Sequence, residues 1–222
     1  QALHDQSVLR EGDALEFAAT EQRHKIKVWR SPLAWGMVFM FGMTSLITYA
    51  MFTWLPVLMV EAGASRAFGG LMVAIFSAFG LLSAFIAPFA AVRMRNPYPL
   101  VLMCVVAYAI AFPGLLLAPM SMPLLWVILL GVGPTTFPLA LTLINLRTQT
   151  HAGATALSGF AQGLGYTLSC AGPLLFGVLH EVSSGWGLPF AFLSVCVVLM
   201  AIGGWQVCKP RMLEDDARVV VE

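Results

Sequence analysis

The stretch SGFAQGLGYTLSCAGPLLFG, residues 158–177, holds five glycines and one proline within twenty residues. In a water-soluble protein this composition disfavours a helix, because glycine costs backbone entropy and proline lacks the backbone N–H donor. In a lipid bilayer the backbone must satisfy its own hydrogen bonds, so a helix survives this composition, and small residues let neighbouring helices approach closely. The stretch therefore indicates a tightly packed membrane helix.

The composition of the whole chain supports this interpretation. Of its 222 residues, 59% are hydrophobic and 10% are charged, whereas an ordinary soluble domain is about one quarter charged. The mean hydropathy is +0.84. A run of about twenty apolar residues spans the hydrocarbon core of a bilayer, and six such runs predict six transmembrane helices in an all-α membrane protein. The predicted spans are residues 35–60, 68–92, 98–118, 122–145, 153–179 and 188–208.

The charged residues agree with this segmentation and predict an orientation. None of the 12 Lys and Arg residues or the 11 Asp and Glu residues falls inside the six runs. Every cation except Arg66 lies in one of the two terminal segments or in the second or fourth connection, which all fall on the same side of the membrane. This excess of positive charge predicts that both termini lie in the cytoplasm. The net charge of +1 gives no indication of a nucleic-acid partner.

These boundaries divide the chain into three parts. Residues 1–34 are predicted to be a cytoplasmic linker, residues 35–208 the six-helix bundle, and residues 209–222 a cytoplasmic tail. The chain begins with Gln1 and shows no signal peptide, so we interpret it as the C-terminal part of a longer polypeptide. The four cysteines lie within or at the end of spans without CxxC spacing, so neither a disulfide framework nor a metal or other cofactor is expected.

A weak internal repeat is visible in the second and fifth spans. GLLSAFIAP, residues 80–88, and GYTLSCAGP, residues 165–173, share a glycine and a proline eight residues apart. Because the second and fifth spans run in opposite directions, the repeat predicts two three-helix units of inverted topology. Secondary transporters use this arrangement.

The fifth span carries a polar stripe. At 100° per residue, Ser158, Gln162, Tyr166 and Ser169 fall within an arc of about 80°. Small residues flank the stripe, with Ala161, Gly165 and Gly172 on one side and Gly159, Gly163 and Gly177 on the other. We therefore expect both flanks to pack against neighbouring helices while the stripe faces a seam or cavity. The alternative is that Gln162 and Tyr166 only hydrogen-bond to a neighbouring helix.

Two other spans carry polar stripes. The first has Thr44, Ser45, Thr48 and Tyr49, and the fourth, which is interrupted by Pro134 and Pro138, has Thr135, Thr142 and Asn145. Prolines free backbone carbonyls and permit the bending that a gating helix requires. The third and sixth spans are almost uniformly apolar. The pattern predicts that helices one and four line a pathway, two and five pack beside it, and three and six face lipid.

Four segments resemble a known family: WRSPLAW (29–35), TWLPVLMVEAG (53–63), FPLALTLINLRTQT (137–150) and LSGFAQGLGYTLSCAGPLLFGVLHE (157–181). They are similar to the second half of a major facilitator superfamily transporter, and specifically to its cyanate-transporter and nitroimidazole-transporter-like branch. The resemblance covers residues 29–190. It implies a twelve-helix transporter of the bacterial plasma membrane with alternating access, in which this chain supplies helices seven to twelve. The partner would be the missing N-terminal six-helix half.

The chain departs from the superfamily pattern at two places. The loop AVRMRNPYPL, residues 91–100, holds Arg93 and Arg95 but lacks the acidic residue of the superfamily's cytoplasmic-loop motif, so gating through that motif is not implied here. CAGPLLFG, residues 170–177, resembles the Gly-Pro motif of antiporters but lies in the repeat-related helix. It does not indicate antiport.

Together the stripes give a candidate substrate site. The substrate is expected to be small and neutral or singly charged, such as cyanate or a small heteroaromatic compound, and to be held by hydrogen bonds. The expected binding residues are Gln162, Tyr166, Ser158, Thr48, Tyr49, Thr44 and Asn145. The expected gating or interfacial residues are Arg147, Pro138, Arg93 and Arg95. Arg147 is predicted either to attract or gate a small anion or to anchor the helix end at the interface.

The sequence contains no motif that indicates an enzyme. GxSxG, HExxH and a metal-ligand cluster are absent, so we expect a non-enzyme. Without a charged residue inside a span there is no obvious proton carrier, and coupling would lie in the missing half, or the protein would be a facilitator. The alternative functions are a non-transporting membrane interaction module and a self-dimerising half-transporter.

Overall fold

The computed structural model describes residues 28–215, so most of the predicted linker and half of the predicted tail lie outside the described residues. Within that range the chain is helical and contains no strand. The elements are η1 (Val28–Arg30), α2 (Pro32–Glu61), α3 (Arg66–Arg93), α4 (Tyr98–Leu117), α5 (Pro123–Val132), η2 (Gly133–Thr135), α6 (Thr136–Leu146), α7 (His151–Ser183) and α8 (Gly187–Cys208).

Each predicted span corresponds to one helical segment, the fourth being the composite α5–η2–α6. Five segments are long and apolar enough to cross a membrane: α2, α3, α4, the composite segment and α8. Helix α7 is not among them, although its 33 residues exceed the length that a span needs. Its glycines and polar side chains lower its hydropathy, and these are the features that distinguish it in the sequence.

Local chemistry sets the helix ends. The side chains of Ser31, Ser65 and Thr150 accept hydrogen bonds from the first turns of α2, α3 and α7, which satisfies backbone donors that have no partner within the helix. Beyond α2, Gly63 has a φ of 96°, and Ser184 after α7 has a φ of 50°. These left-handed residues turn the chain sharply after a helix.

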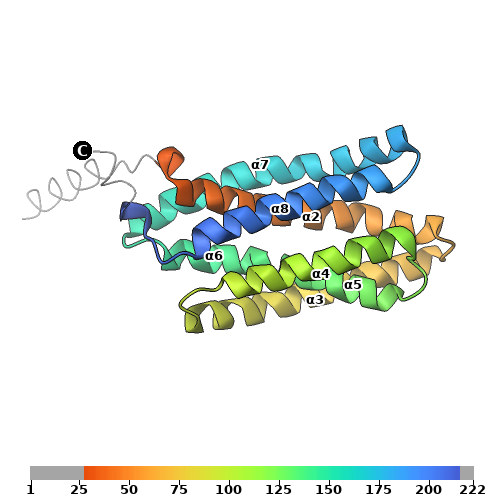
Figure 1. The fold of residues 1–222 in the computed structure, drawn as a ribbon, viewed down its shortest axis with the longest axis horizontal. Coiled ribbons are helices and arrows are strands. Elements are labelled where there is room, and N and C mark those ends of the chain that lie inside the picture. Colours follow the sequence, from red (N-terminus) through yellow and green to blue (C-terminus); the bar gives the residue numbers. More distant parts are fainter. Residues whose placement is uncertain (1–27, 216–222) are drawn as a thin grey trace, which may run out of the picture.

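The helices run side by side along the long axis, and successive connections alternate between the two ends of the bundle (Figure 1). The described chain therefore starts and finishes at the same end, as an even number of passes requires. We call the opposite end, which carries the α2–α3, α4–α5 and α7–α8 connections, the far end. Helix α2 packs most extensively against α7 and α8, whereas α5 packs against α3 and α4.

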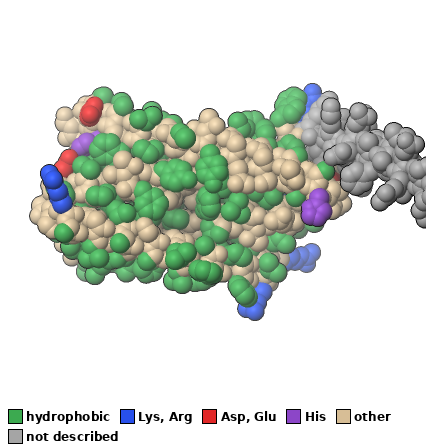
Figure 2. All heavy atoms as spheres, turned by 180° about the vertical axis from the view of Figure 1, so that it is seen from behind, with side chains coloured by type: hydrophobic (Ala, Val, Ile, Leu, Met, Phe, Trp, Pro, Cys, Tyr) green, Lys and Arg blue, Asp and Glu red, His purple; other side chains and the backbone are tan. Residues whose placement is uncertain are grey.

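The surface is apolar along the bundle, and the described charged residues lie at helix ends or in connections (Figure 2). Exposed large apolar side chains occur on α3, α4 and α8, including Phe85, Val106 and Val198. The sequence predicts that the third and sixth helices, α4 and α8, are the ones that face lipid. In the described chain α3 is less buried than either of them, so exposure does not distinguish α4 and α8 from the other helices. The reason is that α3 buries only a narrow stripe, which includes Met72 and Phe76.

The glycine-rich helix α7 packs closely on one flank. A Cβ atom at Gly165 would lie 2.6 Å from the Cδ1 atom of Phe41, and one at Gly172 would lie 2.8 Å from the backbone oxygen of Leu46. Glycine is therefore needed where α7 meets α2. On the other flank, Cβ atoms at Gly159 and Gly163 would meet nothing within 4 Å among the described residues.

The prediction that α7 packs along both flanks is therefore wrong for the described chain. One exception is Gly177 on the second flank, which is buried against the ring of Trp54. The physical reason is position, since α7 lies at an edge of the described bundle and contacts chiefly α2 and α8.

Candidate functional site

The polar side chains of α2 and α7 form a surface that the described residues leave uncovered. We call it the open polar face and define it by Thr48 and Tyr49 of α2 and by Ser158, Gln162 and Tyr166 of α7. Tyr49 is 39% exposed and Tyr166 is 38% exposed, and the other three are half-buried. Cys170 lies one turn after Tyr166 on α7 and is also exposed. The structure thus brings together groups that the sequence separates by more than a hundred residues.

Aromatic packing fixes the position of Tyr166. Its ring meets the ring of Phe41 edge-on, with centroids 5.1 Å apart and an interplanar angle of 85°. Phe41 is fully buried and also contacts Phe137 of α6 at 4.8 Å. Edge-to-face pairs of this kind stabilise a defined ring orientation. One buried phenylalanine therefore holds α2, α6 and α7 around the open polar face.

Gln162 has a hydrogen bond within its own helix. Its Nε2 atom donates to the Oγ atom of Ser158, one turn earlier, at 2.5 Å. A glutamine amide has two N–H donors and a carbonyl oxygen with two lone pairs, so this bond uses one of four positions. The remaining positions allow the amide to bind a second group.

Thr44, which the sequence assigns to the same site, lies elsewhere. It is fully buried, donates a hydrogen bond to the Met40 backbone oxygen at 2.6 Å, and its Oγ1 atom lies 2.7 Å from Oγ1 of Thr136. Thr48 donates to the backbone oxygen of Thr44 at 2.8 Å but remains half-buried at the face. Thr44 therefore joins α2 to α6 in the interior.

Asn145 is exposed in the last turn of α6. Within residues 28–215 no hydrogen bond ties its side chain to the open polar face. It lies near the end of the bundle where the described chain starts and finishes, while Tyr49 lies more than four turns along α2. The structure thus confines the cluster to α2 and α7.

The fourth span is interrupted at Gly133–Thr135, where a 3₁₀ turn separates α5 from α6. Pro134 lies in this turn and Pro138 in the first turn of α6. Side-chain hydroxyls compensate the local loss of helical hydrogen bonds, because Thr135 donates to the backbone oxygen of Val132 and Thr136 to that of Gly133. A change of helix type at a proline is a place where a span bends.

Arg147, predicted to gate or to anchor, is buried at 8% exposure beside the end of α8. Its Nε atom donates to the backbone oxygen of Val207 and a terminal nitrogen donates to that of Cys208, both at 2.9 Å. Burial lowers the pKa of the guanidinium. The cation lies on helix-terminal carbonyls, where positive charge is favourable. The structure places Arg147 as a clamp between the α6–α7 connection and α8.

Glu214 has a matching role that the sequence reasoning missed. It is 6% exposed, and its Oε1 atom accepts hydrogen bonds from the Gln149 and Thr150 backbone nitrogens and from the Thr150 hydroxyl. These groups lie at the start of α7, where an anion is stabilised. Its partners lie 64 and 65 residues earlier, and helical periodicity carries no signal over that distance.

The other predicted cytoplasmic residues remain at the surface. Arg93 ends α3 and Arg95 follows in the α3–α4 connection, and both are exposed. The guanidinium of Arg93 lies 5.8 Å from the ring centre of Phe89. In residues 28–215, no group of three His, Cys, Asp or Glu side chains is arranged to bind a metal ion.

Comparison with known proteins finds relatives that are all named as transporters. The chain is 32% identical over 188 residues to an uncharacterised transporter YycB of Bacillus subtilis, covering 84% of this chain and 47% of that protein. It is 31% identical over 182 residues to the 2-nitroimidazole transporter of Escherichia coli, covering 82% and 46%. It is 30% identical over 178 residues to the cyanate transport protein CynX of Escherichia coli, covering 80% and 46%.

The chain thus spans about half the length of the curated relatives it matches. No family model and no solved structure matches it. The relatives carry names of transporters, and the apolar helices of the chain are those of a multi-pass membrane protein. Over about four fifths of its length the chain is therefore similar to one half of the cyanate- and nitroimidazole-transporter-like branch of the major facilitator superfamily.

Proposed function

We propose that this chain is the C-terminal half of a transporter that moves a small solute across the bacterial plasma membrane by alternating access. The observation that carries the proposal is the open polar face, because hydrogen-bonding side chains left uncovered on an otherwise apolar membrane surface require a polar environment. A second six-helix half would enclose this face in a central cavity. Coverage of about half of each relative supports this arrangement.

All six helical segments cross the membrane in this proposal, as two inverted three-helix units. The packing supports the repeat, since the first helix of each unit packs against the second and third helices of the other unit. The alternation of connections supports the even number of crossings (Figure 1). The glycines of α7 lower its hydropathy and permit its contact with α2, so its absence from the five most apolar segments is compatible with a crossing.

The chemistry of the face favours a small, flat or compact solute. Tyr49 and Tyr166 offer aromatic rings and hydroxyls, and Gln162 offers an amide, whereas the described residues place no Asp, Glu, Lys or Arg side chain on the face. Cyanate and 2-nitroimidazole, the solutes in the names of two relatives, fit these properties. So does the 4-hydroxybenzoate named for a permease that is 41% identical over 95 residues.

Uptake of these three solutes into liposomes containing the complete transporter tests the proposal. Gln162→Leu and Tyr166→Phe should each reduce uptake several-fold at matched protein abundance, since one hydrogen bond contributes about 1 kcal/mol. Leu164→Ala, on the opposite side of α7 at about 160° from Tyr166, should leave uptake unchanged. If both polar variants transport like the parent, the open polar face is not a binding site.

A second copy of this chain could also cover the open polar face, which would make it a self-dimerising half-transporter. Cys170 lies one turn after Tyr166 on α7 and is exposed, whereas the other three cysteines are buried. A short bismaleimide should crosslink two copies through Cys170 if the faces meet. Failure to crosslink, together with uptake that requires the N-terminal half, favours the first proposal over this one and over a non-transporting interaction module.

A further inference from the structure

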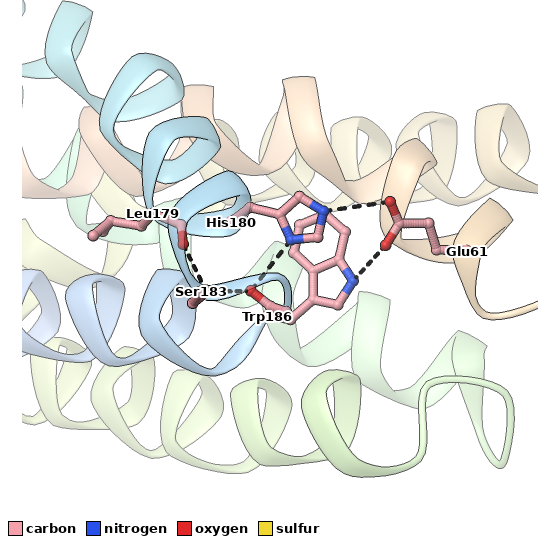
Figure 3. Close-up of polar contacts among 6 residues, drawn as sticks. Glu61, Leu179, His180, Ser183 and Trp186 are labelled. Atoms are coloured by element: carbon pink, nitrogen blue, oxygen red, sulfur yellow. Dashed lines mark hydrogen bonds and ion pairs between the residues drawn. The ribbon is translucent and has the colours of Figure 1, made fainter.

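Three side chains from different elements meet at the far end of the bundle (Figure 3). Glu61 ends α2, His180 lies in the last turn of α7, and Trp186 immediately precedes α8. The Oε1 atom of Glu61 lies 3.4 Å from Nε2 of His180, and Trp186 donates its indole N–H to Oε2 of Glu61 at 3.0 Å. On the other side of the imidazole, Nδ1 lies 3.2 Å from the backbone oxygen of Gly185.

His180 has two polar contacts, a hydrogen bond with Gly185 and an ion pair with Glu61, and together they indicate its protonation. A backbone carbonyl can only accept a hydrogen bond, so the contact with Gly185 requires a proton on Nδ1. The contact with Glu61 is an ion pair only when the imidazole carries a second proton, on Nε2. A neutral imidazole carries one ring proton and can satisfy only one of these contacts. Both exist together when His180 is the doubly protonated imidazolium.

The surroundings favour the proton on His180 over Glu61. The Glu61 side chain is 47% exposed, so water can solvate its charge, and its second oxygen already accepts the Trp186 N–H. The indole of Trp186 stacks on the imidazole at 3.9 Å between ring centres and 19° between planes. An aromatic face attracts a cation at this distance.

We infer that the Glu61–His180 pair is a proton-binding site, at which one proton on the His180 imidazole ties the end of α2 to the α7–α8 connection. Neither the names of the relatives nor the open polar face assigns this site. A proton reaches it from solution, because His180 retains 18% exposure and a cavity of about 290 Å³ opens beside the pair. Leu58, Leu115 and Pro119 are among the residues that line this cavity.

The charged groups around the pair are few. Glu61 is the carboxylate in contact, Arg66 begins α3 five residues after Glu61, and Glu181 follows His180 on α7. The α4–α5 connection and the first turn of α8 contribute no ionisable side chain. Loss of the second proton from the imidazole removes its ion pair with Glu61.

The Glu61–His180 pair bears on the proposed function because α2 and α7, which it joins, are the two helices that carry the open polar face. Proton occupancy at the far end thereby adds or removes the ion pair that joins these helices there. This last step rests on the proposed function, but the proton site does not. Its test uses readouts that need no transport.

The first measurement is ¹⁵N NMR of the histidine side chains in the complete chain, reconstituted in lipid nanodiscs. His180→Gln identifies the His180 signals among the four histidines. We expect both ring nitrogens of His180 to be protonated at mildly acidic pH. Glu61→Gln should lower the ratio of doubly to singly protonated imidazole several-fold at a fixed pH, because the opposite charge is lost. The neighbouring Glu181→Gln, which removes the same charge without a contact to the ring, is the control.

The second measurement is hydrogen exchange at residues 183–186 and at the end of α2. At one pH, Glu61→Gln and His180→Gln should exchange several-fold faster there than the parent and Glu181→Gln. A His180 ring that stays singly protonated from pH 5 to 8 overturns the proton site. So does a Glu61→Gln variant with unchanged His180 protonation. Unchanged exchange in both variants overturns the tie between the helices.

Discussion

A Cβ atom added at Gly42 would lie 3.0 Å from the Cα atom of Gly165, so the backbones of α2 and α7 touch at these two glycines. This contact explains the composition of the glycine-rich stretch. Tyr166 directly follows Gly165 on α7, and Tyr49 lies about two turns after Gly42 on α2.

The contact makes Gly165 and Gly163 differ sharply as sites for alanine. A methyl group at Gly165 would lie 2.6 Å from Phe41, a fully buried ring, whereas one at Gly163 meets open space. We expect Gly165→Ala to destabilise the bundle by about 1–3 kcal/mol through overpacking. Gly163→Ala should be neutral or slightly stabilising. Thermal unfolding in detergent measures both, and equal losses of stability would contradict the α2–α7 contact.

Glu214 should matter for the start of α7. Glu214→Ala removes an anion and the acceptor of three hydrogen bonds from that helix end, so we expect a loss of about 1–3 kcal/mol. Hydrogen exchange should accelerate in residues 149–153. The exposed neighbour Asp215, changed to Asn, is the control. Unaltered hydrogen exchange in Glu214→Ala would show that Glu214 does not stabilise the start of α7.

Tyr108 gives a prediction of the opposite sign. Its hydroxyl is buried at 1% exposure and has no hydrogen-bond partner among the described residues. A buried polar group without a partner is destabilising by about 1–3 kcal/mol, so Tyr108→Phe should raise the unfolding temperature. Thr135→Val, which removes a hydroxyl that is hydrogen-bonded to Ser83 at 2.9 Å, should lower it. A fall in both variants would mean that the Tyr108 hydroxyl has a partner.

Thr44 separates packing from binding. Its contact with Thr136 lies in the interior, so Thr44→Val should destabilise the bundle while the affinity for solute stays unchanged. A double-mutant cycle with Thr136→Val should give a coupling of about 0.6 kcal/mol, typical of membrane proteins. Lower solute affinity at normal stability would return Thr44 to the binding site that the sequence assigns.

The sequence predicts the helical segments well because hydropathy and charge are local properties. It also predicts that Gln162 and Tyr166 share a face, since the 3.6-residue period places them one turn apart. It cannot tell which flank of α7 has a neighbour, so Gly163 and Gly165 look equivalent in the sequence. Three features depend on partners 60 or more positions away in the sequence: the buried contact of Thr44, the hydrogen bonds of Arg147 to the end of α8, and those of Glu214 at the start of α7. Such contacts arise from tertiary packing.

The central claim is that the open polar face lines an aqueous pathway, and Cys170 offers a native probe of it. Cys170 is exposed one turn after Tyr166 on α7, while Cys104, Cys196 and Cys208 are buried. In the complete transporter in membranes, a charged, membrane-impermeant maleimide should label the parent protein, and Cys170→Ala should abolish the labelling. If only an uncharged, lipid-soluble maleimide reacts with Cys170, the face lies against lipid and the account is contradicted.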